Sequence, residues 1–268
     1  MKKLLIGLFL CVLVWSVSAI SAIAEPVDID FNDGIYHITI KGDKMKKRVK
    51  TYASQALITN EEAHKQSGAL LTINAGFFDP KNSKTISYVT MDRQTIEDPM
   101  FNESLLSNPI LRQNLSKIIN RTEFRIVDCD NKYRYEMVPH NTPIDFSCSI
   151  VEAVQGGPLI LPELRLEEEF FIVKDGDKVV RESCSVLHKV PRTILGLKDG
   201  DLHILIITDD HPMDMYEVQA LCKKLGFERA MGLDGGSSTS MNYKKKYNVV
   251  STKGDGAGRS LKSFIMVY

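Results

Sequence analysis

The residues best suited to chemistry lie where apolar runs give way to glycine-rich segments. Asn74, Asp234 and Arg259 each stand in such a segment. Glycine lets the backbone turn sharply and lets a ligand approach the main chain, and successive backbone N–H groups in such turns bind anions. One loop of this kind is usually an ordinary turn, but four together favour a shared site. The four segments are NAGFF (74–78), QGGP (155–158), DGGSS (234–238) and GDGAGR (254–259).

Three further side chains are candidates for the same site. Arg192, in Pro191-Arg192-Thr193, could hold a phosphate or a carboxylate through two N–H groups of its planar guanidinium. Asp209 and Asp210 follow the most strongly apolar strand that we expect, and they are the best candidates for an acid that acts as a base or positions a water. A solvated turn is the alternative for both, because aspartate is common in turns.

A metal site is the alternative interpretation of this acidic segment. Residues 209–214 contain three aspartates and one histidine, but Asp214 is better explained as a helix cap, and the set of hard oxygen ligands is incomplete. We therefore expect neither a metal nor a cofactor. The other histidines that could act stand alone in the sequence, and a lone histidine is more often structural: His140, His188 and His203.

The elements that must position these residues are mostly short strands. Alternating apolar and polar residues, or short buried apolar runs, predict the strands. A hairpin is expected around Asp130-Asn131, which provide a turn between two such runs. The expected strands are 35–40, 69–73, 123–127, 133–138, 202–207 and 261–267.

Helical spacing of apolar residues predicts helices at 59–67, 104–119 and 215–225. The second is expected to break at Asn108-Pro109, because proline disfavours helix in the residue before it. The third has a capping box of Asp214 and Glu217 before it and Gly226 after it. The sum predicts an α+β fold: one mixed domain with a strand-rich sheet, a few flanking helices and glycine-rich loops that form one cleft.

The N-terminus has the three-part form of a secretory signal peptide. Two lysines, an apolar stretch at 4–17 and an A-x-A sequence at 22–24 predict that residues 1–24 are removed. An extracytoplasmic protein, periplasmic or secreted, would then begin at Glu25, and an uncleaved anchor is the alternative. No other stretch is apolar enough to cross a bilayer, so we expect no stable membrane insertion after cleavage. The domain would span 25–268, with 81–149 as an insertion or a lid.

The mature chain would be nearly neutral, with 32 basic and 34 acidic residues and no polybasic block. This balance argues against nucleic acid as a partner. Four cysteines would remain, and an even number in an exported protein allows two disulfides. Cys129 and Cys148 flank the expected hairpin and are the better candidate pair. Cys222 falls on the apolar side of a helix, which favours a buried thiol.

Five motifs, taken in order, resemble the phosphodiester glycosidase family: NAGFF, QGGPLI, PRTILG, LDGGSSTSM and GRSLKSF. The resemblance runs from about Thr59 to Tyr268, most of the mature chain. It implies hydrolysis of the C1–O bond of a sugar 1-phosphodiester, such as an N-acetylglucosamine 1-phosphodiester, with release of a sugar and a phosphomonoester. A carbohydrate phosphodiester is thus the implied partner, and exopolysaccharide metabolism is the implied setting.

The chemistry of this reaction asks for few groups. Breaking a glycosidic bond develops oxocarbenium charge that a carboxylate stabilises or attacks, and Asp234 is the implied catalytic group, with Asp209 or Asp210 as a second acid. A departing phosphate needs cations and N–H groups rather than a strong acid. The binding residues, from the motif matches and the expected glycine cradle, are Asn74, Gly156, Gly157, Arg192, Gly235, Gly236, Ser238 and Arg259.

The sequence departs from the family pattern in two places. Ser237 replaces the third glycine of a D-G-G-G-S motif, and the loop that follows Asp209-Asp210 is short, which leaves the size of the substrate open. A non-catalytic glycan- or phosphate-binding protein is the alternative function. Hydrolysis at the P–O bond is less favoured, because most such hydrolases use a metal cluster or a nucleophile motif, and the sequence shows neither.

Overall fold

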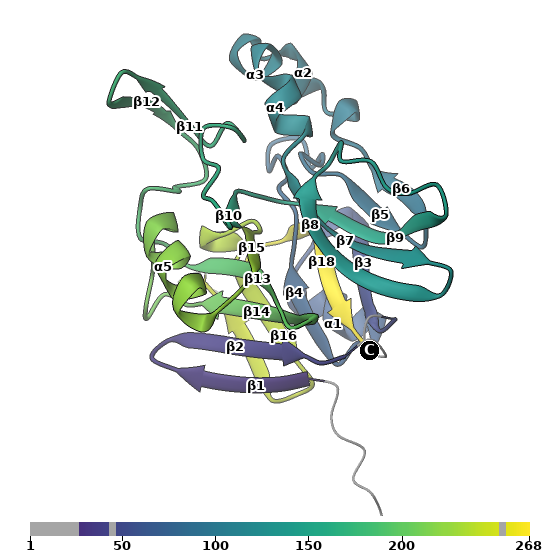
Figure 1. Ribbon diagram of the computed structural model, residues 1–268. Coiled ribbons are helices and arrows are strands. Elements are labelled where there is room, and N and C mark those ends of the chain that lie inside the picture. The colour runs from purple at the N-terminus through teal and green to yellow at the C-terminus, as the bar shows by residue number, and fades with distance from the viewer. Residues whose placement is uncertain (1–26, 43–46, 252–255) are drawn as a thin grey trace, which may run out of the picture.

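A computed structural model describes residues 27–42, 47–251 and 256–268 (Figure 1). The expected signal peptide and its cleavage site lie outside these residues. Within them the strands form four antiparallel sheets, where the sequence analysis expected one. The α+β class is confirmed. No helix of the described residues is long and apolar enough to cross a membrane.

The first sheet has six strands in the order β1-β2-β14-β13-β15-β10. Strands β14 and β15 both run antiparallel to β13, so their C-terminal ends lie on the same side of the sheet. The strands are β1 (Val27–Asn32), β2 (Ile35–Ile40), β10 (Leu159–Leu161), β13 (Arg192–Lys198), β14 (Asp201–Ile207) and β15 (Arg229–Gly232).

Helix α5 (Met215–Leu225) covers one face of this sheet (Figure 1). Its expected capping box is present, since Asp214 accepts from the Glu217 N–H and the Glu217 side chain accepts from Asp214, and Gly226 ends the helix with a left-handed φ of 75°. Side chains alternate along the strands. One set packs on α5 and includes Ile194, Leu205, Ile207 and Ala230, while the other faces the central core and includes Leu195, Ile204, Ile206 and Met231.

The second sheet has the order β17-β16-β4-β18-β3 and carries helix α1 (Asn60–Ser67). The predicted capping box of Thr59 and Glu62 is confirmed at the start of α1. Strand β4 delivers Asn74 at its end, and β18 is preceded by Arg259. The strands are β3 (Val49–Ile58), β4 (Leu71–Asn74), β16 (Ser240–Tyr243), β17 (Tyr247–Val250) and β18 (Leu261–Val267).

The third sheet has the order β6-β5-β9-β7-β8. The expected hairpin around Asp130-Asn131 is its β7–β8 pair, and a disulfide joins Cys129 to Cys148 across the β7–β9 pair, which confirms the preferred pairing. The strands are β5 (Val89–Met91), β6 (Gln94–Glu97), β7 (Thr122–Cys129), β8 (Lys132–Pro139) and β9 (Cys148–Gln155).

Two smaller units stand above the sheets (Figure 1). One is the hairpin of β11 (Ile172–Asp175) and β12 (Lys178–Glu182). The other, which we call the helical cap, is residues 99–119. The helical segment breaks at Asn108-Pro109 as expected, and again at Asn114. The cap contains the 3-10 turn η1 (Pro99–Phe101) and helices α2 (Glu103–Ser107), α3 (Pro109–Gln113) and α4 (Leu115–Ile119).

One core holds the three large sheets together. Ile38 and Ile204 of the first sheet, Ile73 of the second and Phe124 and Val154 of the third are all fully buried in it.

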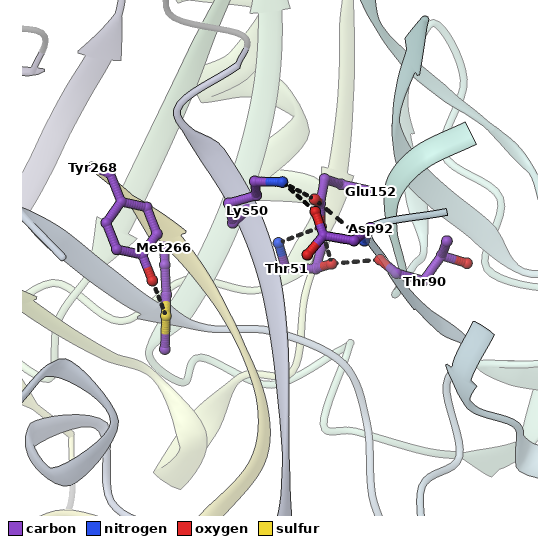
Figure 2. Close-up of polar contacts among 7 residues, drawn as sticks. All are labelled: Lys50, Thr51, Thr90, Asp92, Glu152, Met266 and Tyr268. Atoms are coloured by element: carbon purple, nitrogen blue, oxygen red, sulfur yellow. Dashed lines mark hydrogen bonds and ion pairs between the residues drawn. The ribbon is translucent and has the colours of Figure 1, made fainter. Parts of the chain in front are cut away.

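A buried polar network also joins the second and third sheets (Figure 2). Glu152 on β9 accepts hydrogen bonds from the Thr51 N–H at 3.0 Å, the Thr51 hydroxyl at 2.7 Å and Lys50 Nζ at 2.8 Å. A buried carboxylate is tolerated when its oxygens are paired in this way.

Candidate active site

A cavity of about 250 Å³ lies between the helical cap, the segment that follows β12, and the loops that follow β4 and β15. Half of its lining residues are polar. The polar lining consists of Asp234, three arginines and two small side chains: Arg121, Arg181, Arg259, Ser183 and Cys184. The cavity therefore brings one carboxylate together with a concentration of positive charge.

Asp234 follows β15 directly and is held in place by its own loop. Its N–H donates to the Ala75 carbonyl at 2.9 Å, and its Oδ1 accepts from the Gly235 N–H at 3.0 Å. Burial raises the pKa of Asp234 to about 6, and hydrogen bonding to Ser238 and the charge of Arg259 oppose that rise. The carboxylate therefore ionises near neutral pH, within the range useful to a catalyst.

The Asn74 side chain holds the Asp234 loop through hydrogen bonds. Its Nδ2 donates to the Asp234 carbonyl at 2.6 Å, while its Oδ1 accepts from the Thr193 hydroxyl at 2.7 Å and the Ser240 N–H at 3.0 Å. The side chain is buried and does not line the cavity. The structure brings Asn74 to the site as a positioning residue.

Arg259 and Ser238 come together as expected. Arg259 Nη1 lies 3.0 Å from the Ser237 hydroxyl and 3.4 Å from the Ser238 hydroxyl, and its guanidinium lies 4.9 Å from the Phe78 ring centroid. Ser238 is fully buried in the 3-10 turn η2 (Gly236–Ser238). The NAGFF, DGGSS and GRSLKSF motifs thus meet at one point.

Arg121 and Arg181 supply the other two positive charges, and neither was predicted from the sequence. Arg121 donates from Nε to the Glu169 carbonyl at 2.9 Å and lies over the Phe171 ring at 4.0 Å. Arg181 donates from Nη1 to the Phe170 carbonyl at 3.2 Å. Burial lowers the pKa of each from its ordinary value, but arginine keeps its proton in proteins. Neither residue stands in a glycine-rich motif, so no local signal marked them.

Arg192 has a different position from the one expected. It is almost fully buried and donates to four main-chain carbonyls: from Nε to Met213 at 2.9 Å, from Nη1 to Cys184 at 3.3 Å, and from Nη2 to Ser185 at 2.6 Å and His188 at 2.8 Å. Burial lowers its pKa to about 10. Its planar fork holds the loop that carries Cys184, so the expected phosphate clamp is corrected to a loop support.

The glycine cradle is also corrected, since its N–H groups already have acceptors within the protein. The Gly156 and Gly157 N–H groups donate to the carbonyls of Thr122 and Gly232 at 2.9 and 2.8 Å. A Cβ at Gly156 would lie 2.6 Å from the Gly232 carbonyl oxygen, so close packing of the β9–β10 connection on β15 explains this glycine. Gly235 donates to Asp234, as described above, and Gly236 donates to the Pro191 carbonyl at 2.8 Å.

Asp209 and Asp210 do not reach the cavity. Both are exposed in the turn after β14, beside the β1–β2 turn, where the Thr208 N–H donates to the Gly34 carbonyl at 3.0 Å. Like Asp234, they follow the C-terminal end of a strand on the same side of the sheet, but β13 separates β14 from β15. The expected second acid is therefore not supplied by either residue in this structure. Within the described residues, no three His, Cys, Asp or Glu side chains are grouped so that they could hold a metal ion.

A family model for phosphodiester glycosidases matches residues 67–268. The chain therefore belongs to the phosphodiester glycosidase family, as the motifs indicated.

Solved structures share the fold at low sequence identity. The catalytic domain of zebrafish N-acetylglucosamine-1-phosphodiester alpha-N-acetylglucosaminidase, auto-inhibited by its pro-peptide, matches with a TM-score of 0.63 at 13% identity, over 90% of this chain and 81% of that chain. A hypothetical protein from Synechocystis matches with 0.58 at 12%, over 90% and 61%. A protein from Burkholderia pseudomallei K96243 that is described as exported matches with 0.60 at 11%, over 87% and 73%. A comparison with curated proteins gives no match.

Proposed function

We propose that this protein hydrolyses the glycosidic C1–O bond of sugar 1-phosphodiesters and releases a sugar and a phosphomonoester. The observation that carries the proposal is the cavity itself, in which Asp234 stands with three guanidinium groups. Membership of the phosphodiester glycosidase family supports the reaction type. The zebrafish enzyme shows the same fold and acts, by its name, on an N-acetylglucosamine 1-phosphodiester, so that compound is the first substrate to test.

The residues of the cavity suit the charges of this reaction. The ionised Asp234 stabilises the positive charge that develops at C1, or attacks C1, as the C1–O bond breaks. The bonding electrons leave with the phosphate oxygen. The oxygen of a water finally bonds to C1, and the proton that this water loses passes to the departing phosphomonoester. Arg121, Arg181 and Arg259 balance the negative charge that grows on the departing phosphate. A phosphomonoester leaves without strong protonation, which fits a cavity in which Asp234 is the one carboxylate among the described lining residues.

We also propose that the protein acts outside the cytoplasm. The expected signal peptide supports this location, and so does the Cys129–Cys148 disulfide, because disulfides persist mainly in oxidising compartments. One protein of the same fold is described as exported. Mass analysis of the N-terminus after export tests the location, and a chain that begins at Glu25 is the expected result. A chain that keeps residues 4–17 in the membrane fraction would contradict it.

The direct test is incubation with a panel of sugar 1-phosphodiesters, followed by NMR identification of the products. We expect free sugar and phosphomonoester in equal amounts. Asp234→Asn keeps the shape of the side chain but removes its charge, so turnover should fall by orders of magnitude. Asp30→Asn is the matched control, because Asp30 is exposed on β1, and it should act like the wild type. Tight binding without turnover of any panel member would instead support a non-catalytic glycan- or phosphate-binding protein.

A further inference from the structure

The cavity has an apolar wall that the proposed reaction does not explain. Sugars and phosphates are polar, yet half of the lining residues are apolar: Phe77, Phe78, Ile86, Leu105, Leu111 and Ile118. Leu105, Leu111 and Ile118 come from α2, α3 and α4 in turn. Every helix of the helical cap therefore contributes an apolar side chain to the same cavity.

Two of the arginines, Arg181 and Arg259, contact aromatic rings that belong to the apolar wall or pack against it. The Phe170 ring packs with Leu105 and Ile118 of the cap, and the guanidinium of Arg181 lies 4.1 Å from the centroid of that ring. Arg259 contacts the Phe78 ring in the same manner, while also reaching the DGGSS loop. A phosphate bound to these cations would therefore lie near both Asp234 and the apolar wall.

We propose that the group esterified to the phosphate, opposite the sugar, is an aliphatic chain such as an alkyl or isoprenoid alcohol. The inference rests on the proposed function. A phosphodiester has two arms, and the arm cleaved at C1 must face Asp234. The other arm then runs past the arginines along Leu105, Leu111 and Ile118. A second sugar or a peptide there would press polar groups against side chains that offer no hydrogen bonds, which is costly.

The outer surface of the cap extends this apolar character. Phe101 is 73% exposed and Ile110 is 57% exposed, and both belong to the cap. The cap that lines the cavity with apolar side chains thus also carries large exposed apolar side chains. The substrate class that fits is a lipid alcohol joined to a sugar through a phosphodiester, and its cleavage would release the sugar and an alkyl or prenyl phosphate.

The test compares N-acetylglucosamine 1-(methyl phosphate) with its butyl counterpart. Each methylene buried against the wall should raise kcat/KM about fourfold, so the butyl ester should exceed the methyl ester by at least about tenfold. In Leu111→Ser, or in the milder Leu111→Ala, the ratio should fall toward one. Leu106→Ser is the matched control, because Leu106 is partly buried on α2 but does not line the cavity, and it should keep the wild-type ratio.

Three outcomes separate this inference from the proposed function. Equal turnover of both esters would overturn the aliphatic chain and leave the glycosidase intact. A preference for N-acetylated over plain sugars with no effect of chain length would assign the apolar wall to the acetyl group instead. If neither ester is cleaved, calorimetry with methyl and butyl phosphate still decides, since tighter binding of butyl phosphate that Leu111→Ser removes supports the wall and equal affinity contradicts it.

Discussion

The side-chain amide of Asn74 donates a hydrogen bond of 2.6 Å to the main-chain carbonyl of Asp234, 160 residues further along the chain. This contact joins the NAGFF motif of β4 to the DGGSS motif that follows β15. Asn74 also accepts from Thr193 and Ser240, so its orientation is fixed from three sides. The asparagine therefore sets where the Asp234 carboxylate stands without touching the cavity.

Asn74→Ala should lower kcat/KM at least tenfold, because the Asp234 loop loses its support. The free energy of unfolding should fall by about 2–3 kcal/mol, since buried partners are left unpaired. The control is Asn242→Ala. Asn242 is also buried and donates to Asn60 at 3.0 Å, so its loss should cost similar stability and leave activity within about twofold. Equal activity losses in the two variants would contradict a specific link between Asn74 and Asp234.

The activity should depend on pH through Asp234. Its pKa lies near 6 and the ionised form is the active one, so kcat/KM should rise with pH and reach a plateau above about pH 7. At pH 5 it should be about a tenth of the plateau value. Ser238→Ala removes a hydrogen bond that lowers this pKa, so the acidic limb should shift to higher pH. A profile that falls as pH rises through 6 would make Asp234 a proton donor instead.

The raised pKa of Asp234 means that its ionised form lowers the stability of the folded protein. Its pKa rises from 3.8 to about 6 on folding, so its favourable contribution is complete below about pH 4 and is lost as pH rises through 6. At pH 8 Asp234→Asn should therefore stabilise the protein by about 1–3 kcal/mol while it removes turnover. Denaturant unfolding at pH 4 and pH 8 measures this, and a variant that is no more stable at pH 8 than the wild type would contradict it.

Arg192 and Arg259 should respond differently to replacement by lysine. Arg192→Lys loses donors to buried carbonyls, so it should destabilise the fold by at least about 2 kcal/mol. Arg259→Lys loses the planar fork at the cavity, so it should lower kcat/KM at least tenfold with less than about 1 kcal/mol of stability lost. Thermal unfolding and steady-state kinetics on both variants distinguish the roles. A reversed pattern would restore Arg192 as the phosphate clamp.

Cys184 offers a chemical probe of the cavity. The residue is exposed and lines the cavity, yet desolvation by the surrounding protein raises the pKa of its thiol to about 11 from 9.0. Because the thiolate is the reactive form and its fraction near pH 8 is about 100-fold lower than for an ordinary cysteine, alkylation should be slower than for an ordinary cysteine. The modified protein should lose activity, and methyl phosphate should slow the modification. Buried Cys222 should stay unmodified in the folded protein, and full activity after alkylation of Cys184 would place the reaction elsewhere.

Local signals predicted the parts of the fold that depend on neighbouring residues. Helix α5 begins and ends where its capping residues indicated, and β2 and β18 occupy the ranges predicted for them. Strand β3 was missed, because its buried positions follow no strict alternation. The β11–β12 hairpin was missed as well. The division of the strands into several sheets depends on long-range pairing, which no local pattern carries.

The site shows the same division. The motifs brought Asn74, Asp234, Ser238 and Arg259 to one place, as the sequence analysis expected. A motif does not tell whether the donors of an arginine face a ligand or a carbonyl, and for Arg192 they face carbonyls. Arg121 follows the cap helices without any motif, so only the packing of Phe77 and Phe171 around it reveals its place.

Hydrolysis of a sugar 1-phosphodiester in 18O-labelled water tests the central claim most directly. If Asp234 acts at the anomeric carbon, the C1–O bond breaks and the oxygen of water bonds to C1. Mass spectrometry should then find the label in the sugar hydroxyl at C1, provided that the products are read before anomeric exchange removes it, and the phosphomonoester should be unlabelled. Label mainly in the phosphomonoester would show that the P–O bond breaks and would contradict the glycosidase account.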